Sequence, residues 1–97
     1  MEHISVIWKH RHRDEPARLV SELDGERFEI RKLAFFPDGS VGLASKEGES
    51  GSTRLGEATV PPLAESNEDP EFEGVPITND EFDQLWQEHG GTTAFRR

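Results

Sequence analysis

The first residues that could support chemistry are the histidines of the segment His10-Arg11-His12-Arg13-Asp14. On a strand, His10 and His12 would point to the same side, because side chains alternate along a strand with a period of two. Both imidazoles could then reach one metal ion. A zinc site needs three or four ligands, however, and His3 and His89 stand at no motif spacing. We therefore predict a polar strand end with no metal and no cofactor, and keep a small metal- or ligand-binding enzyme as an alternative.

Serine catalysis and phosphate binding have no motif in this chain. Gly48-Glu49-Ser50-Gly51-Ser52 lacks the last glycine of the Gly-x-Ser-x-Gly turn that exposes a catalytic serine. Gly51–Gly56 has glycines at both ends, but no lysine follows as it does in a phosphate-binding loop. The chain contains no cysteine, which excludes disulfides, thiolate catalysis and cysteine-ligated metal. We expect no catalytic residues and a protein that is not an enzyme.

The strongest pattern in the chain is a long acidic stretch. Between Arg54 and Arg96 there is no lysine or arginine, and there are ten carboxylates. The net charge of −9 falls entirely on residues 37–97, which hold four basic and thirteen acidic residues. A surface of one sign attracts partners of the opposite sign and speeds their association. The stretch therefore predicts a cationic protein partner. It disfavours nucleic acid and anionic membrane surfaces, which proteins bind through lysine and arginine.

Most of these carboxylates are candidates for a partner-binding surface. Asp80 and Glu81 are set aside, because negative charge in the first turn of a helix stabilises the helix itself. Of the other eight, all but Glu57 are the candidates, namely Glu65, Glu68, Asp69, Glu71, Glu73, Asp83 and Glu88. Charge complementarity of this kind makes association fast. The one-sided charge, the small size and the missing catalytic motifs lead us to expect an immunity protein. Such a protein would neutralise a cationic bacterial toxin, such as a nuclease, by covering its active site.

A second hypothesis is an interaction or regulatory domain that works as a homodimer. Its edge strand near Phe72–Ile77 would pair between two copies. The sequence leaves monomer and homodimer open. The N-terminus, Met1-Glu2-His3-Ile4, lacks the charged and apolar regions of a signal peptide, and no apolar run approaches membrane-spanning length. These observations favour a cytoplasmic location.

Alternating apolar and polar residues predict the strands that must position these groups. The pattern indicates strands over residues 3–10, 17–23, 27–36 and 41–44 and a short edge strand over 72–77. A phase slip near Arg31-Lys32 indicates either a bulge or burial of both faces. Turns are predicted at Asp24-Gly25, where glycine would accept a positive φ, and at Pro37-Asp38-Gly39. Lys46–Thr53 is predicted to be an exposed loop.

Helix signals are concentrated near the C-terminus. A helix is predicted over Asn79–His89, with Thr78 and Glu81 forming a capping box and Gly90-Gly91 ending the helix. A shorter helical turn is expected to open at Pro61-Pro62. Trp8 and Trp86 each lie on the apolar stripe of their element, so both are expected in the core, where they could touch if the helix packs on the sheet.

Together these elements predict one α+β domain over residues 1–91, followed by a flexible tail over residues 92–97. Its architecture would be an antiparallel sheet of about four or five strands, a meander, with the C-terminal helix packed on one face. With an apolar content of 32%, the chain has just enough hydrophobic residues for one small core.

The chain also resembles a family of small uncharacterised bacterial domains of about ninety residues. The resemblance rests on motifs spread over residues 4–88. They are Trp8-Lys9-His10, Asp14-Glu15-Pro16, Ser21-Glu22-Leu23-Asp24, Arg27-Phe28-Glu29-Ile30-Arg31-Lys32, Phe36 with Asp38-Gly39, Gly42-Leu43-Ala44-Ser45, Thr53-Arg54-Leu55-Gly56-Glu57, Pro61-Pro62, Asp69-Pro70-Glu71-Phe72-Glu73 and Glu81-Phe82 with Trp86. The sequence departs from the family pattern at Arg11-His12-Arg13 and after His89. The resemblance implies a family, but no activity and no functional residues.

Overall fold

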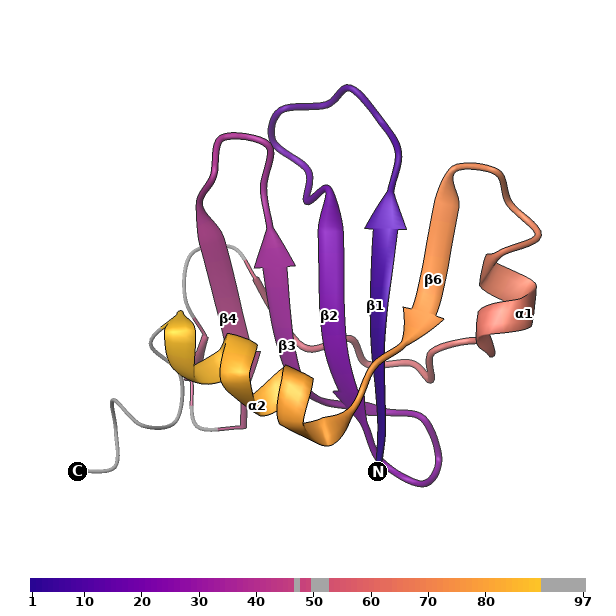
Figure 1. Ribbon diagram of the computed structural model, residues 1–97, viewed down its shortest axis with the longest axis vertical. Coiled ribbons are helices and arrows are strands. Elements are labelled where there is room, and N and C mark those ends of the chain that lie inside the picture. Colours follow the sequence, from indigo (N-terminus) through magenta and orange to yellow (C-terminus); the bar gives the residue numbers. More distant parts are fainter. Residues whose placement is uncertain (47, 50–52, 90–97) are drawn as a thin grey trace.

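The computed structural model describes residues 1–46, 48–49 and 53–89. Their elements, in chain order, are β1 (Glu2–Trp8), β2 (Arg18–Leu23), β3 (Glu29–Phe35), β4 (Val41–Ser45), β5 (Gly48–Glu49), α1 (Leu63–Ser66), β6 (Phe72–Pro76) and α2 (Asn79–Glu88). The strands form one antiparallel sheet in the order β5-β4-β3-β2-β1-β6. The chain therefore runs as a meander toward one edge and then crosses the sheet, so that β6 is added beside β1 at the other edge (Figure 1).

The predicted α+β class, antiparallel meander and C-terminal helix are confirmed, but the described sheet has six strands rather than four or five. The additional strand is β5, whose two residues pair with Ala44 and Ser45. It falls in the segment Lys46–Thr53, which was predicted to be a loop because it is rich in glycine, serine and glutamate. The expected tail over residues 92–97 lies outside the described residues.

The hairpin between β2 and β3 contains the predicted irregularity. Glu22 pairs with Arg31, whereas the next residue, Leu23, pairs with Glu29, so Ile30 has no partner and forms a bulge. The predicted turn at Asp24-Gly25 also forms, but the prediction that glycine adopts the positive φ is wrong. The residue with a positive φ is Arg27, at 71°, and not Gly25.

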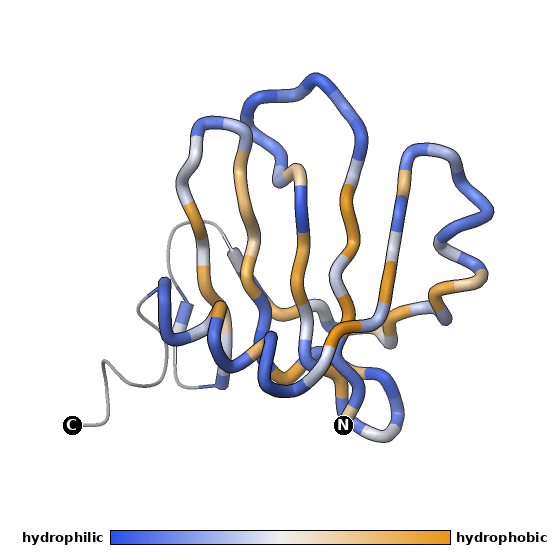
Figure 2. Tube along the Cα trace, viewed as in Figure 1, coloured by the Kyte–Doolittle hydropathy of each residue, from blue (hydrophilic) through white to orange (hydrophobic). Residues whose placement is uncertain are grey.

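Helix α2 covers one face of the sheet, and the main core lies between them (Figure 1). Phe82 and Trp86 of α2 pack on Val20 and Leu33 of the central strands, and all four are almost fully buried. Figure 2 shows hydrophobic residues concentrated in the middle of the strands, with hydrophilic residues in the connecting loops. The helix begins as predicted: Thr78 Oγ1 accepts from the Glu81 N–H, and the Glu81 carboxylate accepts from the Thr78 N–H. It ends at Glu88, with His89 as its C-cap.

The helix covers the face of β1 that the sequence marks as polar. His3 is in ring contact with Phe82, so the odd-numbered side chains of β1 lie under α2. Trp8 points to the opposite face, where it stacks on Phe72 of β6 at a centroid distance of 5.9 Å. The two tryptophans therefore lie on opposite faces and do not touch. Trp86 is a core residue at 2% exposure, whereas Trp8 is only half-buried.

The segment that precedes edge strand β6 forms hydrogen bonds with the outer backbone of this strand. The Asn67 side chain accepts from the Gly74 N–H at 2.7 Å and donates to the Gly74 carbonyl at 3.0 Å. A Cβ at position 74 would lie 2.7 Å from Leu63 Cδ2, so glycine permits the close approach of α1 to the strand.

Gly74→Ala is expected to reduce the free energy of unfolding by about 1 kcal/mol, at the lower end of the range for overpacking because Leu63 can change rotamer. Chemical denaturation measures this change, and amide hydrogen exchange at position 74 should become faster as Asn67 is displaced. Gly25→Ala is the matched control, because a Cβ there meets nothing within 4 Å. Equal stability of the two variants would contradict the tight contact.

Candidate functional site

Five of the seven predicted contact residues belong to one segment at the β6 edge of the sheet. We call this group the acidic corner; it comprises Glu65, Glu68, Asp69, Glu71 and Glu73. All five are exposed. They come from α1, from the turn after it and from the first part of β6, so a single continuous segment presents them.

The acidic corner is partly held in place by neutral and charged contacts. Asp69 Oδ1 accepts from the Glu71 N–H at 2.9 Å, which fixes the turn into β6. Glu71 accepts from Trp8 Nε1 at 3.2 Å, and Glu73 lies 3.2 Å from Lys9 Nζ. Glu65 and Glu68 form no ion pair with any described residue. The corner therefore keeps an excess of negative charge on an ordered backbone.

The other two predicted contact residues do not belong to this surface. Asp83 is half-buried on α2 and accepts from Arg31 at 2.9 Å, so its charge is compensated within the molecule. Glu88 is exposed at the end of α2, which runs away from α1 across the sheet (Figure 1). Five of the seven carboxylates thus share one segment at the β6 edge, and the other two lie elsewhere on α2.

The outer backbone of β6 offers no free donor for a further strand. Lys9 donates to Glu71 and Ile77 donates to His3, so alternation turns the N–H groups of Phe72 and Gly74 outward. The Phe72 N–H is bonded to the Asp69 carbonyl and the Gly74 N–H to Asn67. Pro76, the next outward position, has no N–H. The outward backbone donors that strand addition would use are therefore bonded within the chain at Phe72 and Gly74 and absent at Pro76.

A buried polar cluster under α2 was not found by sequence reasoning. His3 Nε2 lies 2.9 Å from Glu22 Oε2, and Arg31 donates to both oxygens of Glu22 at 2.6 and 2.9 Å. The same guanidinium donates to Asp83 of α2 and lies over the rings of Phe82 and Trp86, at 4.7 and 5.3 Å from their centroids. The only sequence signal is that positions 22 and 31 face each other across the predicted hairpin.

In the buried polar cluster, Glu22 and Arg31 stabilise each other's charged form, as expected of a structural ion pair. The hydrogen bonds from Arg31 hold the pKa of the Glu22 carboxyl below its ordinary value, despite burial, which acts in the opposite direction. Those bonds also raise the pKa of Arg31. Glu22 is only 6% exposed, and both of its oxygens are engaged. It is therefore a fixed carboxylate that ties β2 to β3 and, through Arg31, to α2.

The rings of the two histidines singled out by the sequence pack on each other, and that of His10 also packs on Trp8. The His10 ring lies 4.4 Å from that of Trp8 and 5.5 Å from that of His12. His10 Nδ1 accepts from the His12 N–H at 2.9 Å, so the proton is assigned to Nε2, which donates to the Pro16 carbonyl at 2.7 Å. Both nitrogens of His10 are thus used within the β1–β2 loop. Among the described residues, no three side chains come together as metal ligands.

Comparison with known proteins identifies the family of this chain. A family model described as a domain of unknown function (DUF6881) matches residues 2–91. The chain belongs to this family. The resemblance seen in the sequence is therefore confirmed at the level of the family, whose description gives no activity. No curated protein and no solved structure matches the chain. None of the described helices has the length and apolar character needed to cross a membrane.

Glu22→Gln is expected to lower the free energy of unfolding by about 3 kcal/mol at neutral pH, because it leaves Arg31 without its main buried partner. The pKa of Glu22 is depressed in the folded protein. Its contribution is therefore complete above the pKa of an unfolded glutamate, about 4.3, and is lost as the pH falls through the lower folded value. Urea unfolding followed by tryptophan fluorescence should show the difference from wild type shrinking below about pH 4.

Glu26→Gln provides the control for this measurement, since Glu26 is exposed. It should change the free energy of unfolding by less than about 0.5 kcal/mol. A Glu22→Gln variant as stable as the control at pH 7 would show that the charge of Glu22 contributes nothing beyond what a neutral amide at this position contributes.

Proposed function

We propose that this protein is a small non-catalytic binding domain of the immunity type, which inhibits a cationic protein through the acidic corner. The observation that carries the proposal is the presence of five exposed carboxylates on one ordered segment. Only one of them, Glu73, has a cationic neighbour among the described residues. A cationic toxin, such as a nuclease, has the complementary charge at its substrate site.

The surroundings of the acidic corner favour recognition by side chains. Its turn is fixed by Asp69, and its strand is fixed by the Asn67–Gly74 hydrogen bonds. Carboxylates on a rigid frame lose little conformational entropy when a partner binds, which raises affinity. Because the outward N–H groups of β6 are already bonded, a partner would contact the carboxylates rather than extend the sheet.

The same hydrogen bonds weigh against the alternative of a homodimer formed by pairing of two β6 strands. That alternative needs free backbone groups at the edge, and Gly74 has none to offer. Sedimentation over a range of concentrations tests it directly. Because Gly74→Ala is expected to displace Asn67 and free the β6 edge, a concentration-dependent dimer that this substitution does not strengthen would favour a dimer through another face.

The experiment for the proposal is capture of a partner by immobilised protein from a lysate of the native host at low and at moderate salt. The double variant Glu65→Lys/Glu68→Lys changes two exposed carboxylates that form no ion pair with a described residue. We expect this variant to bind the captured cationic protein at least tenfold more weakly, because both contacts become repulsive. Purified partner and surface plasmon resonance give the affinities.

The matched control is Glu26→Lys/Glu57→Lys, which produces the same change in net charge at exposed positions outside the corner. It should retain at least half of the affinity measured for the wild-type protein at moderate salt. An equal loss in both variants would mean that net charge alone drives binding. Absence of any cationic partner at either salt concentration would overturn the proposal.

A further inference from the structure

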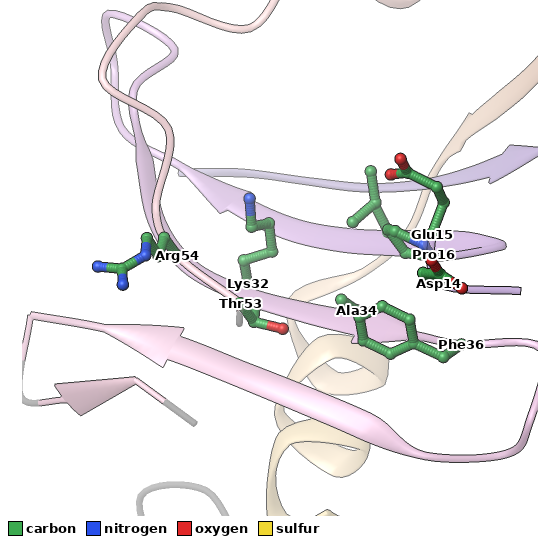
Figure 3. Close-up of a pocket in the computed structure, with 9 residues that line it drawn as sticks. Asp14, Glu15, Pro16, Lys32, Ala34, Phe36, Thr53 and Arg54 are labelled. Atoms are coloured by element: carbon green, nitrogen blue, oxygen red, sulfur yellow. The ribbon is translucent and has the colours of Figure 1, made fainter. Parts of the chain in front are cut away.

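A pocket lies on the face of the sheet opposite α2, away from the acidic corner. Its floor is a row along β3, where Lys32, Ala34 and Phe36 alternate to the same side, with Leu19 of β2 directly opposite Ala34. Its volume is about 270 Å³, close to the size range of small-molecule sites. Figure 3 shows the row with its side chains.

The two ends of the pocket differ in chemistry. The row from Lys32 to Phe36 spans about 13 Å at 3.3 Å per residue. Asp14 and Glu15 of the β1–β2 loop lie at the Phe36 end, and Thr53 lies near Lys32 at the other (Figure 3). The loop is held there by the Ala17 N–H, which donates to the Phe35 carbonyl at 2.7 Å.

The Thr53 end of the pocket contains a polar atom that has no partner in the described part of the chain. Thr53 is 5% exposed, and its Oγ1 is buried with no hydrogen bond to any described residue. A buried hydroxyl without a hydrogen-bond partner destabilises the folded protein, and such atoms are rare in folded proteins. In Figure 3 this hydroxyl points along the pocket toward Ala34. It is therefore a hydrogen-bonding group that is available to a bound molecule.

The charges that remain uncompensated in the pocket are negative. Lys32 Nζ lies 3.3 Å from Glu29, and Arg54 lies 3.4 Å from Glu49, so both cations are already paired. Asp14 and Glu15 form no ion pair with any described residue. With the half-buried ring of Phe36 beside them, they form the combination of carboxylates and an aromatic face that attracts organic cations.

From this arrangement we infer that the pocket binds an elongated organic amine. The ammonium group lies at Asp14, Glu15 and the Phe36 ring, and the apolar body lies over Ala34 and Leu19. A hydroxyl or carbonyl at the far end of the ligand forms a hydrogen bond with Thr53 Oγ1. This site is separate from the acidic corner, and it does not depend on the proposed inhibition of a cationic protein.

Three small probes separate these contacts. Tyramine carries an ammonium group, an aromatic body and a distal hydroxyl; phenethylamine lacks the hydroxyl; 4-hydroxyphenylacetate replaces the cation with an anion. Amide chemical shifts in ¹⁵N-labelled protein should move on titration with tyramine at Ala34, Phe36 and Thr53. Half-saturation is expected near 1 mM, the affinity typical of a ligand with about ten heavy atoms. Phenethylamine should bind about fivefold more weakly, and 4-hydroxyphenylacetate should not bind.

Variants assign each contact to a residue. Thr53→Val should weaken tyramine binding about fivefold and leave phenethylamine binding unchanged, whereas Thr53→Ser should preserve the preference for tyramine. Since the hydroxyl forms no hydrogen bond within residues 1–46, 48–49 and 53–89, Thr53→Val should melt at the wild-type temperature or higher, which separates loss of binding from loss of folding. Thr59→Val, exposed and outside the pocket, is the control.

The cation contact has its own test. Asp14→Asn/Glu15→Gln should weaken both amines about tenfold, and added salt should weaken wild-type binding in the same direction. The inference is overturned by equal affinity for tyramine and 4-hydroxyphenylacetate. It is also overturned if no saturable shift occurs at these amides up to about 20 mM, which is well above the affinity expected for such a ligand.

Discussion

The contact on which the fold depends most is the buried ion pair between Glu22 and Arg31. It joins adjacent strands next to the bulge of the β2–β3 hairpin, and it continues to α2 through Asp83 and the rings of Phe82 and Trp86. A guanidinium suits this position, because one planar group can form a bidentate bond to a carboxylate and stack on aromatic rings at the same time. The pair therefore links β2 and β3 to α2, beside the apolar contacts of Phe82 and Trp86 with the central strands.

Once α2 is fixed on that face, the rest of the chain must cover the other face and the β6 edge. The segment after β5 crosses the sheet, α1 packs on β6 where glycine allows close contact, and Asn67 closes the strand edge. A sealed edge is a common protection against unwanted strand pairing. Here it also leaves the side chains of the acidic corner as the available means of recognition.

The molecule thus presents two separate surfaces with different chemistry. The acidic corner is exposed and suits a large cationic partner, whereas the pocket on β3 is concave and suits a small amine. Both carry uncompensated carboxylates, but only the pocket combines them with an aromatic ring and a buried hydroxyl at Thr53. A small domain of this kind can support both, because one site lies at the β6 edge of the sheet and the other lies over the central strands β2 and β3.

Much of the fold could be predicted from residues close together in the sequence. Alternation indicated the longer strands, the phase slip near Arg31-Lys32 indicated the bulge, and Thr78 with Glu81 indicated the start of α2. These features depend on interactions within a few residues, which a single sequence displays directly. Two-residue β5 was missed because so short a strand has no periodicity.

The positions of the functional groups could not be predicted in the same way. The seven acidic candidates were expected to act together, but Asp83 turned inward to Arg31, and Glu88 lies at the far end of α2. The pocket brings together Asp14, Phe36 and Thr53, which are far apart in the chain. By itself the sequence determined the elements and the sign of the charge. Only the tertiary structure decided which carboxylates stay free, because strand register and the face that α2 covers depend on contacts between distant residues.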